Sequence, residues 1–202
     1  ASTAVPFGML NQRSRYTAAG GKFGSGDLVT VLGGANDIFQ ALPAAGASAS
    51  PVGAMTPVVT AAASNVNSLV NTVAGAGAGT ILVSNLPKLS LTPQFRGTAA
   101  APLADYSAST FNTALQTNLT ATAAARPGSN IILMDLFKVG DPLAANPGAF
   151  GITNITQPCF NGATVCSNPD SYFYFDGVHP TAAGHRITAH VPIDYLYYGD
   201  LG

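Results

Sequence analysis

The chain has 202 residues, of which 47% are hydrophobic and only 8% are charged, and its formal net charge is −1. This length is sufficient for one domain with its own core, so we interpret residues 1–202 as a single domain. The low charge, without a basic stripe, argues against a nucleic-acid-binding protein. No apolar run approaches the roughly 18 residues of a transmembrane helix, and the chain contains no segment typical of a signal peptide.

Three short apolar segments predict buried strands at residues 28–32, 81–84 and 131–136, each introduced by a glycine or a polar turn. Between the strands, two segments place apolar residues at helix spacing, from Met55 to Val73 and from Leu103 to Leu119. Roughly fifty residues separate successive strands, which is enough for a crossover helix and its loops. This alternation predicts an α/β fold with a parallel sheet covered on both faces.

The remaining segments carry weaker patterns. Residues 43–54 and 74–79 are rich in glycine, alanine and serine and are predicted to be loops, and residues 158–168 predict an irregular excursion. A last helix is expected to begin near Thr181 and to be disturbed by Pro192.

Polar residues follow the predicted strands. Because ligands bind beyond the carboxyl ends of parallel strands, this rule selects Asn36 and Asp37 after the first strand and Asn85 after the second. Asp135 ends the third strand, and we expect it to make local hydrogen bonds rather than to take part in catalysis.

The residues Gly33-Gly34-Ala35-Asn36-Asp37 stand where the first strand ends. One interpretation is an ordinary strand-to-helix turn with a side-chain cap. The other is that the Asn36 amide points toward a developing oxyanion, where one such donor is worth roughly 10²–10³ in rate. Gly34 and Asp37 are then expected to support the turn that holds Asn36.

The segment Asp176-Gly177-Val178-His179-Pro180-Thr181 is a second candidate. Asp176 can hold one ring N–H of His179, which leaves the opposite nitrogen to take a proton from a serine hydroxyl. The alternative is a loop ion pair without catalytic meaning. His185 and His190 lack the i, i+4 spacing of a helical metal pair, so we expect neither a metal site nor a cofactor.

The two cysteines, Cys159 and Cys166, lie in the loop-like segment. A disulfide between them would fit an oxidising compartment, whereas two free thiols are the alternative. The lack of a nearby histidine argues against zinc.

The GxND turn and the DxxHPT segment, in this order, resemble the motifs of the GDSL (SGNH) hydrolases. The flanking segments GDLVTVLGGANDIF, TILVSNLPKLSLTP, SNIILMDLF and CSNPDSYFYFDGVHPTAAGH are similar to the secreted lipase-esterase, lecithinase- or haemolysin-like branch, and the resemblance covers nearly the whole chain. It implies a flavodoxin-like three-layer α/β/α sandwich. It also implies that Asn36 is the oxyanion residue and that Asp176 and His179 are the acid and base of a catalytic triad.

By this resemblance, the protein is a serine esterase or lipase that hydrolyses lipid, phospholipid or small aryl and alkyl esters through an acyl-enzyme. A membrane-lipid surface is then expected as a substrate. A secreted or cell-surface location, in a bacterium, is expected from the resemblance and from the alanine-, glycine- and threonine-rich composition.

The chain departs from the family pattern at the nucleophile. The family's Gly-Asp-Ser-Leu motif and its glycine oxyanion donor have no counterpart here, Ser25 precedes its strand, and Ser84 lies within one. We therefore expect an N-terminal fragment of the same protein to supply the serine and the N-terminal strands, and we expect the chain to be inactive without it. Two alternatives remain open, a carbohydrate O-deacetylase of the same fold and a non-catalytic, adhesin-like surface passenger.

Overall fold

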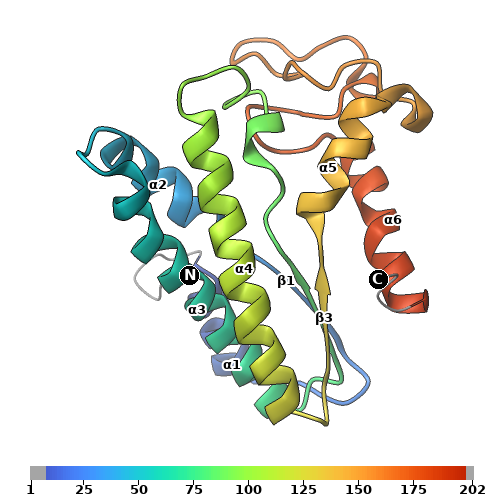
Figure 1. Cartoon of the computed structure of the whole chain (residues 1–202). Helices are drawn as coiled ribbons and strands as arrows, with labels where there is room; N and C mark the ends of the chain where they lie inside the picture. The colour runs from blue at the N-terminus through green and yellow to red at the C-terminus, as the bar shows by residue number, and fades with distance from the viewer. Residues whose placement is uncertain (1–7, 199–202) are drawn as a thin grey trace. The chain divides into compact units, whose positions relative to one another are not determined.

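The computed structural model describes residues 8–198, apart from the side chains of residues 191–198. The chain alternates helices and strands, as the sequence predicted, and the α/β class is confirmed (Figure 1). In chain order the elements are α1 (Met9–Ala18), β1 (Leu28–Leu32), α2 (Ala35–Gly46), α3 (Pro51–Gly75), β2 (Thr80–Ser84), the 3₁₀ turn η1 (Leu89–Leu91), α4 (Ala101–Ala125), β3 (Asn130–Met134), α5 (Leu136–Ala145), η2 (Pro147–Phe150), η3 (Pro169–Ser171) and α6 (Ala182–Tyr198).

The chain divides into two compact units. Unit 1 contains the residues up to Leu86 together with Tyr106–Asp135, and unit 2 contains Pro87–Asp105 together with the residues from Leu136 onward. The interpretation of residues 1–202 as one domain therefore stays a prediction.

Unit 1 contains a parallel sheet with the strand order β1-β2-β3. Leu28, Thr80 and Asn130 are in register at one end, and Leu32, Ser84 and Met134 at the other. The three predicted strands are confirmed. The third ends at Met134 instead of residue 136, because Leu136 already belongs to α5.

The helices α3 and α4 lie side by side in unit 1 (Figure 1). The strands lie in the sheet in the same order as in the chain, β1-β2-β3. Because crossovers between parallel strands are right-handed, this order places both crossover helices on the same face of the sheet. Side-chain hydrogen bonds join the helices, with 2.9 Å between the Thr56 and Tyr106 hydroxyls and 2.8 Å between Thr122 Oγ1 and Asn67 Oδ1. The apolar side chains that these helices bury include Met55, Val59, Val66, Val70, Val73, Phe111, Leu115 and Leu119.

The loop predicted at residues 43–54 is mostly wrong, whereas residues 76–79 form most of the loop predicted at residues 74–79. Helix α2 continues to Gly46, α3 begins at Pro51 and ends at Gly75, and only short connections remain. Alanine is the strongest helix former, and α2 buries Leu42 and Ala45. Pro51 is the first residue of α3. The backbone N–H at this position makes no hydrogen bond within a helix, so proline, which lacks it, costs no hydrogen bond there.

Unit 2 has a small core of its own, formed by Leu143, Ile152, Phe173, Tyr174 and Ala183. Helix α6 begins beside Thr181, as predicted, and its backbone stays helical through Pro192 up to Tyr198. Residues 158–168 contain neither helix nor extended strand, which confirms the predicted irregular excursion.

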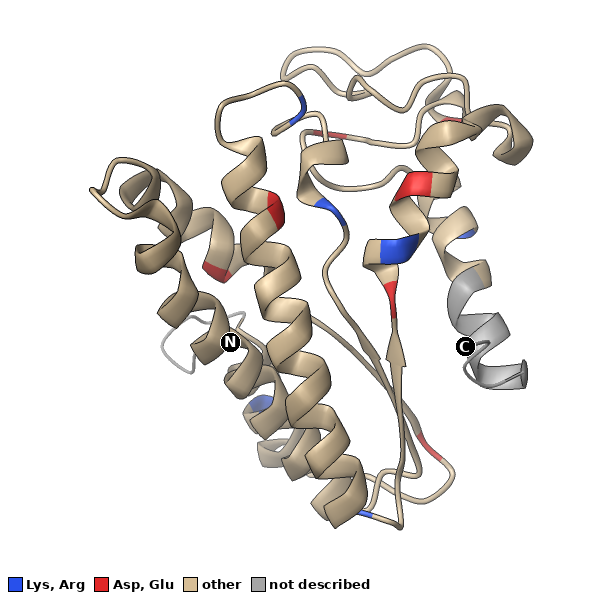
Figure 2. Ribbon diagram, in the orientation of Figure 1, with Lys and Arg blue, Asp and Glu red and all other residues tan. Residues whose placement is uncertain are grey.

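The few charged residues are scattered along the described part of the chain rather than gathered into a stripe (Figure 2). Of the helices among the described residues, none combines the length and the apolar character needed to cross a membrane.

Candidate active site

Asp176 and His179 meet in a tight turn of unit 2. His179 Nδ1 lies 2.8 Å from Asp176 Oδ2. An ionised carboxylate can only accept hydrogen bonds, so Nδ1 carries the proton and Nε2 is the basic nitrogen of the ring. The His179 side chain is 74% exposed. The turn therefore presents an oriented imidazole to solvent.

The second oxygen of Asp176 holds the backbone of the same turn. Oδ1 accepts hydrogen bonds from the backbone N–H of Val178 at 2.9 Å and of His179 at 2.7 Å. Partial burial of the carboxyl acts to raise the pKa of Asp176, but these backbone bonds and the His179 ring outweigh it and lower that pKa below 3.8. The carboxylate is thus kept ionised beside the imidazole.

The residues before the turn are anchored in the core of unit 2. Phe173 and Tyr174 are buried and pack edge to face, with ring centroids 4.9 Å apart. Burial raises the pKa of Tyr174 to about 12, although the charge of Arg96 acts to lower it. The buried aromatic residues ahead of Asp176 therefore fix the loop. Phe175, by contrast, is 39% exposed.

The residues after the turn are held by Thr181, which caps α6. Its hydroxyl donates to the Tyr172 carbonyl at 2.6 Å and accepts from the Gly184 N–H at 3.0 Å. Because Thr181 is only 3% exposed, this capping contact lies in the interior of unit 2.

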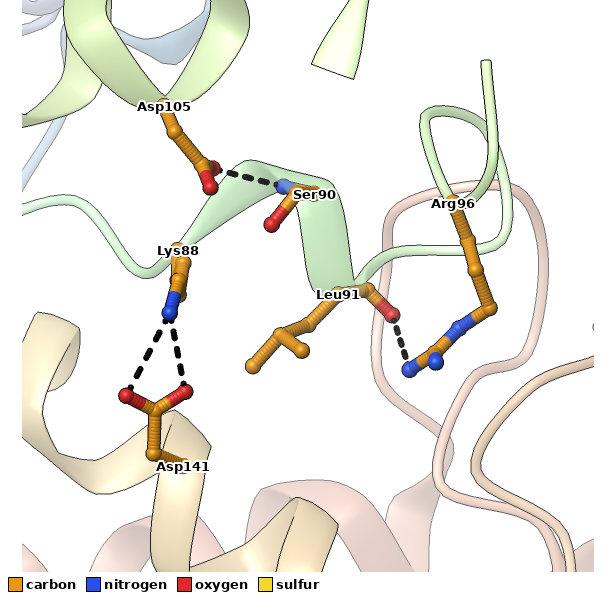
Figure 3. Close-up of polar contacts among 6 residues, drawn as sticks. All are labelled: Lys88, Ser90, Leu91, Arg96, Asp105 and Asp141. Carbon is orange, nitrogen blue, oxygen red and sulfur yellow. Dashed lines mark hydrogen bonds and ion pairs between the residues drawn. The ribbon is translucent and has the colours of Figure 1, made fainter. Parts of the chain in front are cut away.

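The segment of residues 88–96 also contacts the Asp176–His179 turn, through Gly177. The Gln94 N–H donates to the Gly177 carbonyl at 2.9 Å. Lys88 pairs with Asp141 at 3.1 Å, the Ser90 N–H donates to Asp105, and Arg96 donates to the Leu91 carbonyl (Figure 3). These contacts fix the segment that reaches Gly177.

The disulfide between Cys159 and Cys166, expected as one of two alternatives, is present. It closes a short hairpin whose first residues pair with the strand-like segment before Asp176, since Cys159 N–H donates to the Tyr174 carbonyl and Phe160 N–H to the Phe175 carbonyl. Such a bond fits an oxidising, extracellular location.

Asn36 lies in unit 1, in the first turn of α2 after β1. Gly34 is the N-cap of this helix, with φ +109°, and a Cβ at this position would lie 2.5 Å from the Phe111 ring. The turn thus depends on glycine for its backbone conformation and for the contact with α4. Asn36 is exposed, whereas Asp37 is half-buried in the first turn and does not serve as the N-cap.

Two further polar contacts occupy the carboxyl ends of the strands in unit 1. The Asn85 amide donates to Asp135 at 2.8 Å, which agrees with the expected local role of Asp135. The Asn112 side chain clamps Leu86, accepting from its N–H at 2.8 Å and donating to its carbonyl at 2.9 Å. Sequence reasoning missed Asn112, although an amide beside Phe111 on an apolar helix could have indicated it.

The two serines considered from the sequence lie at opposite ends of the sheet. Ser25 precedes β1 while Asn36 follows it, a separation of roughly 15–20 Å along the strand. Ser84 is the last residue of β2 and is 9% exposed. Asp176 and His179 belong to unit 2, whereas Asn36 belongs to unit 1.

His185 and His190 lie exposed on α6. Within the part of the chain that the structure describes, no three His, Cys, Asp or Glu side chains are grouped so that they could hold a metal ion.

Comparison with known proteins gives a consistent picture. The family model described as GDSL-like lipase/acylhydrolase matches residues 9–191. The anther-specific proline-rich protein APG of Arabidopsis thaliana is 25% identical over 92% of this chain and 39% of its own length. A protein from the trpE-trpG intergenic region of Pseudomonas putida is 27% identical over 94% of this chain and 31% of its own length. A GDSL esterase/lipase of Arabidopsis thaliana is 25% identical over 63% of this chain and 41% of its own length. The chain therefore spans about two fifths or less of each of these relatives.

Proposed function

The chain belongs to the GDSL-like lipase/acylhydrolase family, and from this premise we propose that it is the acid–base part of a serine esterase that hydrolyses carboxylic esters through an acyl-enzyme. The observation that carries the proposal is the 2.8 Å contact between Asp176 Oδ2 and His179 Nδ1, made by an imidazole that is largely exposed. A carboxylate held by two backbone N–H groups can orient such a ring and stabilise its protonated form.

The proposed reaction assigns one role to each residue. His179 Nε2 takes the proton of the serine hydroxyl as the serine attacks the ester carbonyl, and His179 then gives this proton to the leaving alcohol. Water, activated by the same imidazole, hydrolyses the acyl-enzyme in the second half of the reaction. Asn36 is the proposed donor to the oxyanion, and Gly34 and Asp37 support its turn.

The nucleophile is proposed to come from an N-terminal segment of the same protein, without which this chain is inactive. This part of the proposal is supported by the two serines considered from the sequence, since Ser25 precedes β1 and Ser84 is buried at the end of β2. It is also supported by β1, an edge strand that leaves Leu28 51% exposed and Leu32 61% exposed. On its other side β1 has no paired strand among the described residues, so the backbone groups of that edge could pair with a further strand.

The proposed substrates are lipid, phospholipid or small aryl and alkyl esters, with a membrane surface as one place where such esters occur. The proposed location is secreted or cell-surface in a bacterium, and the disulfide supports an oxidising compartment. No observation favours the carbohydrate O-deacetylase or the non-catalytic passenger over the esterase.

Hydrolysis of a p-nitrophenyl ester by the full-length protein tests the proposal. His179→Ala should lower kcat by roughly 10⁴-fold or more, because the serine loses its base, and Asn36→Ala should lower kcat by about 10²–10³-fold. His185→Ala, which removes an exposed histidine of α6, is the matched control. A fluorophosphonate should label a serine outside residues 1–202, and a His179→Ala variant with the wild-type rate would refute the assignment.

A further inference from the structure

The hairpin closed by Cys159 and Cys166 is joined to the segment that leads into Asp176. The Cys159 N–H donates to the Tyr174 carbonyl at 3.0 Å, and the Phe160 N–H donates to the Phe175 carbonyl at 2.7 Å. The Phe160 ring also stacks on the Phe175 ring, with centroids 5.9 Å apart and an angle of 14° between the rings. Backbone and side-chain contacts therefore join the hairpin to the two residues that precede Asp176.

The next contact in this series reaches the turn itself. The Phe175 N–H donates to the His179 carbonyl at 2.8 Å, and Tyr174 forms a bridge with Pro180. Residues 174–175 thus lie between the hairpin on one side and residues 179–180 on the other. A displacement of residues 174–175 would move both ends of the turn that holds Asp176 against His179.

The tip of the hairpin has no buried residue to keep it in place. Residues 161–165 are all exposed, and Asn161 Oδ1 accepts hydrogen bonds only from within the hairpin in the described contacts. The disulfide and the 2.7 Å bond from the Cys166 N–H to the Cys159 carbonyl close it. In a segment without a core, a covalent link of this kind takes over the role of packing.

We propose that Cys159, Cys166 and Phe160 are positioning residues, and that the disulfide-closed hairpin holds the Asp176–His179 pair in the geometry that ester hydrolysis requires. The inference rests on the proposed function. The hairpin acts through residues 174–175, so opening it reduces turnover and leaves substrate binding nearly unchanged. The Gln94 contact with Gly177 braces the turn separately, so the turn loosens without unfolding.

The experiment measures kcat and KM of the full-length protein on a p-nitrophenyl ester before and after treatment with dithiothreitol. The dithiol reduces the disulfide to two thiols and is itself oxidised to its cyclic disulfide. We expect kcat to fall roughly 10- to 100-fold, the loss that a displacement of about 1 Å in a catalytic group produces, while KM stays within twofold. Removal of the reductant and reoxidation should restore kcat.

Three variants separate positioning from a general loss of structure. Cys159→Ser/Cys166→Ser should reproduce the low kcat and should not respond to dithiothreitol, which excludes effects of the reductant elsewhere in the protein. Phe160→Ala should lower kcat, and Phe160→Tyr, which keeps the stacked ring, should restore it. In a His179→Ala background, reduction should leave the residual rate unchanged, because the hairpin acts through that histidine.

The outcomes are distinct. Unchanged kcat on reduction, a change confined to KM, or an equal loss of rate in the His179→Ala background would each overturn the positioning role. The ¹⁵N shifts of the His179 ring give a readout that needs no hydrolysis. Reduction should shift them from the Nδ1–H tautomer toward the mixture of a free histidine, and shifts that do not change would overturn the inference even if the proposed esterase activity fails.

Discussion

The Asp176 carboxylate holds the Asp176–His179 turn together. Its two oxygens accept hydrogen bonds from two backbone N–H groups and from the imidazole. The folded protein therefore binds a proton on Asp176 less readily than the unfolded chain does, and the pKa of Asp176 is lowered. For a group with a depressed folded pKa, the stabilising contribution is fully present above the unfolded pKa and is lost as the pH falls through the folded one.

We predict that the stability of the Asp176→Asn variant depends less on pH than the stability of the wild type does. The difference in Tm between the wild type and this variant should be constant above about pH 5 and should shrink as the pH falls below 3.8, the ordinary value for an aspartate. Thermal unfolding followed by circular dichroism at half-unit pH intervals measures this difference. A difference that stays constant down to pH 2 would show that the charge of Asp176 contributes nothing to folding.

Gly34 determines the turn that carries Asn36. Gly34→Ala should destabilise unit 1 by roughly 2–4 kcal/mol, since it combines a strained φ of +109° with a contact of 2.5 Å to the Phe111 ring. Gly20→Ala is the matched control, because Gly20 also has a positive φ, +85°, but has nothing within 4 Å of the added Cβ. Urea denaturation of both variants gives the comparison, and equal costs would contradict a role for the Phe111 contact.

Among the elements, α4 does more than cover the sheet. Its Asn112 satisfies both backbone groups of Leu86, which is 1% exposed and follows β2. Buried backbone N–H and carbonyl groups without a hydrogen-bond partner cost free energy. The Asn112 side chain replaces the partners that the sheet no longer supplies once β2 has ended, so Leu86 can be buried there.

Asn112→Leu should therefore cost roughly 2–4 kcal/mol, since a side chain of similar size leaves a buried N–H and a buried carbonyl without partners. Thr113→Ala, next to it on the helix, removes an exposed hydroxyl that bonds to the Ser109 carbonyl and should change stability by less than about 0.5 kcal/mol. Guanidinium denaturation of both variants distinguishes the two positions. Equal effects would contradict the clamp.

At the scale of the whole molecule, β1 is the feature that bears on the proposed N-terminal segment. It pairs with β2 on one side, and its Leu28 and Leu32 are exposed, whereas the residues of β2 from Ile81 to Ser84 are buried. We expect a strand from the N-terminal segment to pair along its other side. Amide hydrogen exchange at Leu28–Leu32 should then be much slower in the full-length protein than in residues 1–202 alone, with the amides of β2 as the internal reference. Equal exchange rates in the two proteins would contradict the additional strand.

Local patterns predicted the three strands, the two long helices and the start of α6, because their apolar residues repeat with the period of the element that buries them. The boundaries were less predictable. Residues 43–46 and 51–54 contain too few apolar side chains at helix spacing to mark a buried face, although they are helical. The disulfide could be stated from sequence only as one of two alternatives.

The sequence by itself determined the family, through the order of the GxND and DxxHPT motifs. It also determined the Asp176–His179 pair, because a separation of three residues lets the Asp176 carboxylate contact the backbone and the imidazole of the same turn. Only the tertiary structure decided what holds that pair in place. The braces at Gln94, Phe160 and Thr181 come from segments up to about eighty residues away, and hydrogen bonds between such segments leave no periodic pattern in the sequence. Likewise, the need for glycine at residue 34 arises from Phe111, a contact that exists only once α4 has packed beside β1 and α2.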